Sequence, residues 1–509
     1  MRALLAWTLL AGALGVTASE RGDPWRPLYH FTPPRNFMND PNGLVHLDGE
    51  YHLFYQHNPE GDTWGHMSWG HAVSPDMLRW SDLPLALREE GGVMIFSGSA
   101  VHDRRNTSGL CEGRPETCLI AVYTGHGQDR QTQNLAVSVD SGRTWRKHAG
   151  NPVLDIGAKD FRDPKVLWHE PTRRWVMVVA LSTEKKVRFY GSPDLRRWEA
   201  LSDFGPQGSV DGVWECPDLF EMPVEGQPGR TRWVLDVDVD RGAPAGGTGG
   251  QYFVGDFDGR RFRSDSPPDA KPRWVDYGRD FYASQSFSDL PEGDRRRIWM
   301  GWLSNWEYAK VEPTPPWRGV QSIPREVRLV AAGGEIVLAQ QPIREVQTLR
   351  GAPVGVEPGK VAGRRLLPVA GDALDIEAVF RPGTAKAFGL AVRVGDGEET
   401  LVGYDASASR LFVDRTRSGR SDFHPAFAGR HAGPLAVEGG LLRLRILVDR
   451  SSVEVFGGDT LVEGAGGRTA ISDRIFPQPE SRGVALFAEG GTAELVSLRA
   501  WPLQAAVRR

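Results

Sequence analysis

Short apolar runs, each a few residues long and bounded by turn residues, recur along the chain. They are rich in β-branched and aromatic residues, as in Tyr51–Tyr55 and Trp175–Ala180, and no long amphipathic helical pattern interrupts them. Runs of the same kind lie at Leu119–Tyr123, Arg232–Val237 and Ile298–Trp302. The pattern predicts an all-β protein built from short strands.

A turn motif repeats within this region. Ser74–Trp80 (SPDMLRW) recurs as Ser192–Trp198 (SPDLRRW), more loosely as Ser138–Trp145, and in degenerate form as Gly255–Phe262. The copies start about 60 residues apart, and each places a polar turn between one strand and an aromatic residue that begins the next. Such a period is typical of four-stranded propeller blades. We predict a five-bladed β-propeller over residues 25–335; a stack of unrelated hairpins is the alternative.

The pattern changes after the propeller region. We predict a short connector at residues 336–350, followed by a β-sandwich at residues 351–505. The strands expected in the sandwich are Asp375–Phe380, Ala387–Val394, Leu441–Val448, Val453–Phe456 and Gly483–Ala488.

Charge is nearly balanced along the chain. Its 65 acidic residues stand against 61 Lys and Arg, for a formal net charge of −4. This balance argues against nucleic acid or an anionic membrane as a partner and favours a neutral ligand.

The N-terminus has the pattern of an export signal. Arg2 precedes the apolar stretch Ala3–Val16, and Ala18 ends a small-residue cleavage site. The stretch is shorter than the roughly 20 residues that span a bilayer. We predict a signal peptide at residues 1–18 and a secreted or periplasmic mature protein without a membrane partner; the oligomeric state stays open.

Three acidic residues lie just ahead of prolines. Asp40 stands in FMNDPNG, Asp163 in FRDP and Glu215 in WECPD. Proline fixes its own φ and restricts the residue before it, so each carboxylate belongs to a stiff turn. One such turn alone is more often an ordinary hairpin. Three of them indicate an acid/base constellation on a rigid scaffold.

These motifs, in this order, resemble glycoside hydrolase family 32, the β-fructofuranosidases that include invertases, inulinases and levanases. Phe96–Ser99 (FSGS) and Ser322–Glu326 (SIPRE) stand where the family has similar segments. The resemblance runs from about Pro27 to about Leu503. It implies a catalytic propeller, a C-terminal β-sandwich and hydrolysis of fructosyl bonds.

The resemblance also implies roles for single residues. Asp40 is expected to be the nucleophile, Glu215 the acid/base catalyst, and Asp163 a third acid that holds fructose hydroxyls. Trp214 and Cys216 flank Glu215 and predict an apolar setting that favours its protonated form. The residues expected to bind the fructosyl unit are Asn39, Pro41, Asn42, Gln56, Trp64, Phe96, Ser97, Arg162 and Trp306.

Two segments bear on the substrate. Val311–Arg318 and Gly249–Gly259 resemble levanases and exo-inulinases more than sucrose-restricted invertases. We therefore predict a β-fructosidase that releases fructose from levan or inulin and from sucrose, through a covalent fructosyl-enzyme. The alternatives are a sucrose-restricted invertase, a fructosyltransferase and, from another class, a non-catalytic fructan-binding protein. The three acids favour an enzyme, since a binding protein does not need them.

Histidines and cysteines complete the candidates. Five histidines between His46 and His71 match no zinc spacing, and no nucleotide-binding loop is present, so we predict neither a metal nor a cofactor. Cys111 and Cys118 can close a small disulfide in an oxidising compartment, although their pairing stays open. Cys216 is expected to be a buried wall residue.

Overall fold

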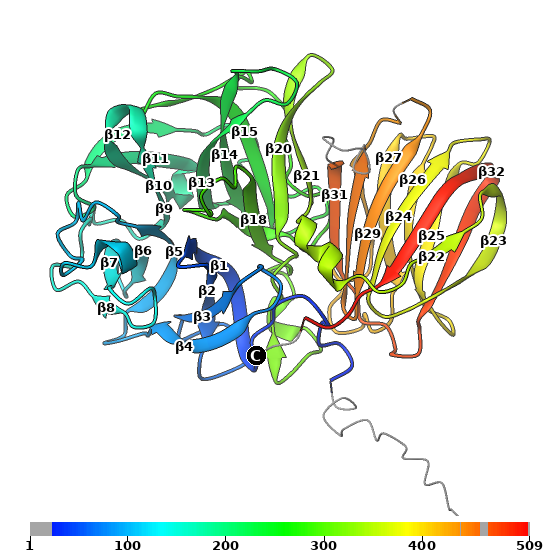
Figure 1. Cartoon of the computed structure of the whole chain (residues 1–509), viewed down its shortest axis with the longest axis horizontal. Helices are drawn as coiled ribbons and strands as arrows, with labels where there is room; N and C mark the ends of the chain where they lie inside the picture. The colour runs from blue at the N-terminus through cyan, green and yellow to red at the C-terminus, as the bar shows by residue number, and fades with distance from the viewer. Residues whose placement is uncertain (1–22, 438, 459–466, 507–509) are drawn as a thin grey trace, which may run out of the picture.

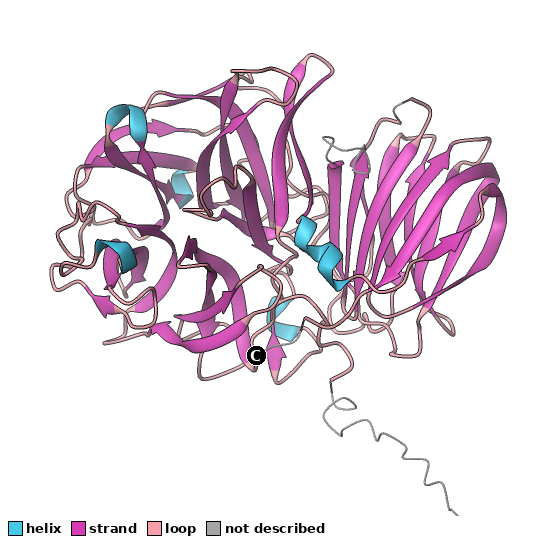
Figure 2. Ribbon diagram, viewed as in Figure 1, coloured by secondary structure: helices cyan, strands magenta, loops and turns pink. Residues whose placement is uncertain are grey.

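The computed structural model describes residues 23–437, 439–458 and 467–506. The predicted signal peptide lies outside the described residues. Within them the regular structure consists of strands and five short 3-10 turns, so the all-β prediction is confirmed (Figure 2). The turns are η1 (Pro115–Thr117), η2 (Glu170–Thr172), η3 (Ser182–Glu184), η4 (Ala309–Val311) and η5 (Arg344–Leu349). No helix of the described part is long and apolar enough to cross a membrane.

Four separate antiparallel sheets form propeller blades (Figure 1). The first contains β1 (Asn36–Leu47), β2 (Glu50–Asn58), β3 (Ser68–Ser74) and β4 (Ser81–Leu87), with β19 (Trp317–Arg318) added parallel to β1. The second contains β5 (Met94–His102), β6 (Leu119–His126), β7 (Gln131–Ser138) and β8 (Arg146–Lys147). The third contains β9 (Phe161–His169), β10 (Arg174–Leu181), β11 (Lys186–Ser192) and β12 (Glu199–Phe204). The fourth contains β13 (Trp214–Pro223), β14 (Thr231–Val239), β15 (Gly249–Phe257) and β16 (Phe262–Ser264).

The repeated turn motif marks the same place in each of these blades. All four copies connect the third strand of a sheet to the fourth. In the first copy, Asp76 Oδ1 accepts hydrogen bonds from the backbone N–H groups of Leu78 and Arg79, at 3.0 and 2.8 Å. Asp194 makes the equivalent bonds in the third blade. The repeat therefore reports an Asp-stabilised turn between two strands of one blade.

A further antiparallel meander continues into the C-terminal part. It consists of β17 (Tyr282–Ser286), β18 (Arg297–Trp302), β20 (Arg325–Ala332) and β21 (Glu335–Pro342), and it joins the C-terminal sheet where Gln340 pairs with Gly467. The predicted connector at 336–350 is therefore wrong in its first half, because 336–342 completes a β-hairpin with β20. Along the chain, η5 and its flanks link the two parts.

The C-terminal part is a sheet-rich domain with its own apolar core. Its longest strand, β32, pairs with β22, β23, β24 and β25. The strands are β22 (Val354–Val356), β23 (Gly359–Ala370), β24 (Leu374–Arg381), β25 (Ala387–Val394), β26 (Glu399–Asp405), β27 (Arg410–Arg417), β28 (Arg430–Pro434), β29 (Leu442–Asp449), β30 (Ser452–Gly458), β31 (Gly467–Arg474) and β32 (Gly483–Pro502).

Buried charges connect this domain to the propeller. His30, ahead of β1, places Nδ1 2.8 Å from Asp449 Oδ2 and Nε2 2.9 Å from Glu454 Oε1. Arg325 on β20 donates to the other oxygen of Glu454 and, at 2.9 Å, to Asp276. All five side chains are buried, so removing one partner would leave an uncompensated charge in the interface.

This network predicts a loss of stability at alkaline pH. Burial by itself would lower the pKa of His30, but its bonds to Asp449 and Glu454 outweigh burial and raise that pKa to about 9. The pKa of His30 in the folded protein exceeds the unfolded value of 6.5. The contribution of protonated His30 to the free energy of unfolding is therefore fully present below pH 6.5 and disappears as the pH rises through about 9. It amounts to on the order of 3 kcal/mol. Urea unfolding should show that the free energy of unfolding falls more between pH 6.5 and pH 9 for the wild type than for His30→Gln. An equal fall in both proteins would contradict the stabilising role of protonated His30.

Candidate active site

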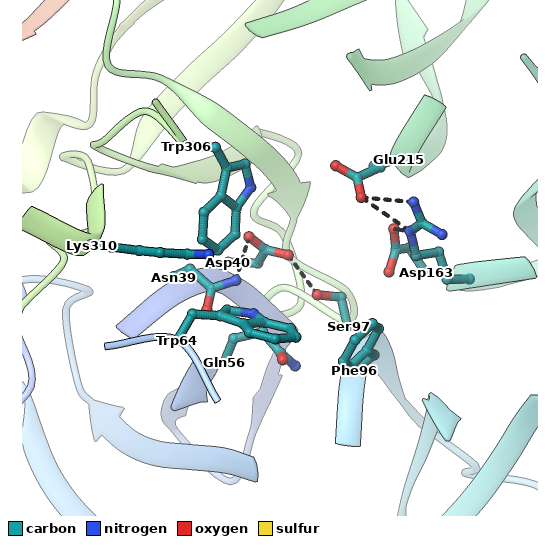
Figure 3. Close-up of a pocket in the computed structure, with 11 residues that line it drawn as sticks. Asn39, Asp40, Gln56, Trp64, Phe96, Ser97, Asp163, Glu215, Trp306 and Lys310 are labelled. Carbon is teal, nitrogen blue, oxygen red and sulfur yellow. Dashed lines mark hydrogen bonds and ion pairs between the residues drawn. The ribbon is translucent and has the colours of Figure 1, made fainter. Parts of the chain in front are cut away.

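One pocket gathers most of the predicted site residues at the ends where the first strands of the blades begin. Its volume is about 260 Å³. The residues that line it are Asn39, Asp40, Gln56, Trp64, Phe96, Ser97, Arg162, Asp163, Glu215, Trp306 and Lys310 (Figure 3). The three acids, separated by more than 50 residues in sequence, thus share one cavity.

The first strands lose regular pairing where they carry these residues. Register shifts interrupt β1 at 38–41, β5 at 95–98 and β13 at 215–218, and another lies opposite the start of β9. Asp163 and Cys216 also have positive φ angles of 66° and 45°. In three of these segments a proline, Pro41, Pro164 or Pro217, lacks the N–H that a regular ladder would use. Such irregularities aim side chains away from the pleat, here into the pocket.

Asp40 is held by two neutral donors. Ser97 Oγ donates to its Oδ2 at 2.7 Å, and Asn39 Nδ2 donates to its Oδ1 at 3.0 Å. Burial raises the pKa of Asp40, the charge of Glu215 raises it further, and the two hydrogen bonds oppose the rise. The carboxylate is therefore fixed in position without a cation in direct contact, which leaves it reactive towards an electron-poor carbon.

Glu215 lies between a cation and a phenol. Arg162 Nε and Nη2 each lie 3.0 Å from its Oε1, and the Tyr282 hydroxyl donates to its Oε2. The apolar setting predicted from its neighbours is wrong, because Trp214 points into a core between blades and the partners of the carboxyl are Arg162 and Tyr282. These donors orient the Glu215 carboxyl towards the pocket.

Asp163 also lies near the Arg162 guanidinium, but farther from it than Glu215 does. Its Oδ2 accepts the backbone N–H of Cys216 at 3.0 Å and lies 4.0 Å from Arg162 Nε. Burial, with the charges of Glu215 and Asp40, raises the pKa of Asp163 to about 7, although Arg162 and the Cys216 N–H oppose the rise. The cluster therefore retains a proton close to neutral pH, so ionised and protonated carboxyls coexist.

Aromatic side chains form the walls of the pocket. The Trp306 ring stacks on Phe37, with ring centroids 6.0 Å apart, and its centroid lies 4.7 Å from that of Trp302. Trp64 packs edge to face against Phe96, with centroids 6.1 Å apart. Trp302 is fully buried and belongs to the core. Trp306 and Trp64 thus present apolar faces beside a polar floor, which suits the alternating faces of a sugar ring.

Two predicted binding residues do not line the pocket. Asn42 is buried, and its Oδ1 accepts the Gly98 N–H at 3.2 Å, so its side chain ties β1 to β5. Pro41 shapes the strand start without facing the cavity. Conversely, sequence reasoning missed Tyr282 and Lys310. Lys310 follows Trp306 by four residues at the pocket rim, and no motif in the sequence marks either residue.

The histidines take structural positions. His52 Nδ1 and His71 Nε2 lie 3.0 Å apart, and His57 Nδ1 bonds to the Phe37 carbonyl at 2.9 Å. Burial lowers the pKa of His52 and of His57 to about 4. Over the described ranges, no group of three or more His, Cys, Asp or Glu side chains is arranged to hold a metal ion.

The cysteines separate into a bonded pair and a free thiol. Cys111 and Cys118 form a disulfide that closes the loop around η1. Cys216 is free, and its Sγ lies 3.6 Å from Asp40 Oδ2 and 3.7 Å from Asp163 Oδ2. Burial and the surrounding carboxylates raise the pKa of this thiol well above its usual value, so it is a poor nucleophile.

Comparison with known proteins gives matches over nearly the whole chain. The model for the N-terminal domain of glycosyl hydrolases family 32 matches residues 30–342, and the model for the family's C-terminal domain matches residues 345–502. A levanase of Bacillus subtilis is 48% identical over 98% of this chain and 73% of its own length. The crystal structure of an exo-inulinase from Aspergillus awamori superposes with a TM-score of 0.89 at 36% identity, covering 96% of this chain and 99% of that one. A β-fructofuranosidase from Schwanniomyces occidentalis, complexed with fructosyl-erythritol, gives a TM-score of 0.86 at 31% identity over 97% and 99% of the two chains.

Proposed function

The chain belongs to glycosyl hydrolases family 32, and from this premise we propose that it cleaves β-fructosidic bonds, releasing fructose from fructans such as levan and inulin and from sucrose. The observation that carries the proposal is the single pocket in which Asp40, Asp163 and Glu215 meet beside Arg162. Its relatives named levanase, exo-inulinase and β-fructofuranosidase support the substrate class.

The first chemical step forms a bond to Asp40. The ionised carboxylate attacks the anomeric carbon of the terminal fructosyl unit while the bond from that carbon to the leaving oxygen breaks. Protonated Glu215 gives its proton to the leaving oxygen, so the rest of the substrate departs as a neutral alcohol. The products of this step are a fructosyl ester on Asp40 and an ionised Glu215.

The second step returns both carboxyls to their starting forms. Glu215 accepts a proton from water, and the water oxygen attacks the anomeric carbon as the ester bond to Asp40 breaks. Fructose leaves with its anomeric configuration retained, because two inversions cancel. Arg162 and Tyr282 hold Glu215 through both steps, and their contacts stabilise its ionised form between them.

Asp163 is proposed to bind the fructosyl ring. Its buried oxygens can accept hydrogen bonds from ring hydroxyls, and these bonds strengthen as positive charge develops at the anomeric carbon. Asn39, Gln56, Trp64, Phe96, Ser97 and Trp306 would complete the fructosyl site. Their uncharged groups suit a neutral sugar, in agreement with the balanced charge of the chain.

Product analysis with levan, inulin and sucrose, each incubated with the purified protein, tests this function. We expect fructose from all three and no ladder of intermediate oligosaccharides from the polymers. Hydrolysis of sucrose alone would replace the proposal with an invertase, and transfer of fructose to sugar acceptors would indicate a fructosyltransferase. Absence of products from every fructoside would favour a binding protein.

Replacing Trp306 with Ala should weaken transition-state binding for every substrate. The indole presents apolar area to the fructosyl site, and its loss is expected to cost about 1 to 3 kcal/mol in kcat/KM. Steady-state kinetics with levan, inulin and sucrose should show similar losses, because the three substrates share the terminal fructosyl unit. A loss confined to one polymer would place Trp306 at a leaving-group site instead.

The proposal also covers a fifth propeller blade, a C-terminal β-sandwich and export of the protein. The strands β17, β18, β20 and β21 repeat the meander of the four blades, so we assign them as a fifth blade that closes the propeller against β1. The C-terminal sheets are assigned as a β-sandwich around their common core. A cleaved export signal and secretion agree with the disulfide and with the relatives described as extracellular.

A further inference from the structure

Two cavities lie at the end of the propeller opposite the candidate active site. Their volumes are about 360 and 350 Å³. Leu167, Trp168, Glu170, Ser288 and Arg297 line both of them, so the two adjoin, and we call them together the basal cavity. Among the described residues, none lines both the basal cavity and the active-site pocket. The basal cavity is therefore a separate candidate site.

The same strands carry the two sites at opposite ends. Near its start β9 places Asp163 in the active-site pocket, and near its end it places Leu167 in the basal cavity. On β13, Glu215 and Phe220 are related in the same way. Four or five residues of strand separate the sites by on the order of 15 Å. The basal cavity thus opens at the other mouth of the propeller axis, which the proposed catalytic steps do not use.

The floor of the basal cavity has more cationic groups than its buried carboxylate can neutralise. Lys165 Nζ lies 3.3 Å from Asp218 Oδ2 and donates to the Ser286 carbonyl at 2.6 Å. Burial lowers the pKa of Lys165, Asp218 opposes the fall, and the nearby charge of Arg297 adds to it. One carboxylate therefore faces two cations, and the floor can accept a further negative charge.

Arg297 keeps most of its hydrogen-bonding capacity for a ligand. Its Nη1 donates to the Phe287 carbonyl at 3.4 Å, and its guanidinium carbon lies 5.0 Å from the centre of the Phe220 ring. Within the part of the chain that the structure describes, it makes no other hydrogen bond and no ion pair. Burial lowers its pKa, and the charge of Asp218 offsets this only in part. A planar fork of five N–H donors matches a carboxylate, so a ligand carboxylate would supply the missing partner.

The other arginines of the basal cavity already have carboxylate partners. Arg104 pairs with Asp289 at 2.9 Å, and Arg105 pairs with Glu170 at 3.5 Å. These pairs leave the guanidinium at the floor as the one to attract an anion. Two further acids line the cavity and accept hydrogen bonds from nearby donors, namely Asp103 and Glu221.

Aromatic side chains form the walls beside this cation. Trp168, Phe220 and Trp233 line the cavity, and Ser288 adds a hydroxyl. Aromatic walls bind apolar or ring-shaped bodies, while a hydroxyl can donate to an oxygen of the ligand. The combination suits an organic anion with its charged group on Arg297 and its body against the rings.

We propose that the basal cavity binds a small organic carboxylate, with the carboxylate on the Arg297 guanidinium and the apolar body against Trp168. The site goes beyond the proposed function, and its occupation does not require a fructosyl substrate. A bound anion would offset the excess positive charge of the floor. It would also stabilise the folded chain by an amount that grows with the ratio of its concentration to Kd.

Benzoate and benzyl alcohol are matched probes for this site, since they share a ring and differ in charge. Calorimetric titration of the wild type with sodium benzoate, in a buffer free of phosphate and other carboxylates, should show saturable binding. Benzyl alcohol should bind at least about 10-fold more weakly, because it cannot form the paired hydrogen bonds with Arg297. Absence of saturable benzoate binding up to about 10 mM, or equal affinity for the alcohol, would overturn the proposal.

Two variants locate the bound benzoate. Arg297→Gln should raise its Kd about 10-fold or more, because the amide keeps a polar group but loses the charged fork. Ser288→Glu should raise the Kd by a similar factor, because it places a competing carboxylate inside the cavity. This second variant keeps every charged group of the floor, so it tests the site even if Arg297→Gln does not fold. Thermal unfolding of each variant reports whether the chain is folded.

Arg328→Gln is the matched control. Arg328 lies on β20 of the same meander and outside the basal cavity, and it already pairs with Glu225 at 3.1 Å. Its replacement should leave the Kd of benzoate unchanged. An unchanged Kd in folded Arg297→Gln or in Ser288→Glu would overturn the assignment to the basal cavity, as would an equal increase in Arg328→Gln.

Discussion

Replacing Asp40 with Asn should lower kcat for sucrose and fructans by a factor of about 10³ or more, because the amide cannot form the fructosyl ester. The change keeps the shape of the side chain. It also substitutes a neutral group where burial already disfavours the charge of the carboxylate, so the fold should persist. The measurement is single-turnover and steady-state hydrolysis of sucrose, with thermal unfolding as the check on folding.

The control for this variant is Asn42→Ser, close to Asp40 on the same strand but directed at the backbone of β5 rather than at the pocket. Its effect should fall mainly on the free energy of unfolding. If Asp40→Asn retained more than about a tenth of wild-type kcat in a folded protein, the carboxylate would not be the nucleophile.

Replacing Glu215 with Gln should give a loss that depends on the leaving group. With sucrose, kcat should again fall by about 10³ or more, because no proton reaches the departing oxygen. With fructosyl fluoride, whose leaving group needs no proton, the first step should recover most of its rate. The second step should stay slow, because the introduced amide cannot accept a proton from the attacking water. An initial burst of fluoride should therefore precede a slow steady state.

Asp40→Asn provides the matched comparison, since it lacks the nucleophile for either leaving group. The fluoride should restore little of its activity. If the two variants responded alike to the change of leaving group, the roles assigned to Asp40 and Glu215 would be wrong. Stopped-time assays of released fluoride with both variants make this comparison directly.

The fold was predictable where a local motif and a global repeat agreed. The Ser-Pro-Asp turns fix the connection between the third and fourth strands through bonds that form within a few residues, so the sequence alone reveals the blade unit. The boundary near residue 340 was not predictable in the same way. Residues 336–342 become a strand because β20 lies beside them, and such pairing depends on tertiary context.

Site residues that belong to a recognisable sequence motif were predictable. Residues that reach the site only through tertiary packing were not. Asp40, Asp163 and Glu215 lie in proline-stiffened segments that recur at the strand starts. Tyr282 reaches Glu215 from β17, 67 residues later in the chain, and no local sequence pattern predicts that contact. Lys310 likewise enters the pocket from the segment after β18.

The environment of Glu215 shows the same limit. Its sequence neighbours suggested an apolar setting, but Trp214 points into a core between blades, and Cys216 faces Asp40 and Asp163. The groups that surround the carboxyl are Arg162 and Tyr282, which sequence distance conceals. The side chains that surround a strand residue are therefore set by the geometry of the blades more than by its neighbours in sequence.

The covalent intermediate is the central claim, and peptide mass spectrometry tests it most directly. The Glu215→Gln variant is mixed with fructosyl fluoride, quenched in acid during the slow phase and digested. The mechanism predicts a mass increase of one fructosyl unit on the peptide that contains Asp40, and none when Asp40 is also changed to Asn. A fructosyl group on another residue would contradict the covalent intermediate on Asp40. So would rapid turnover that releases fructose of inverted anomeric configuration and leaves no labelled peptide.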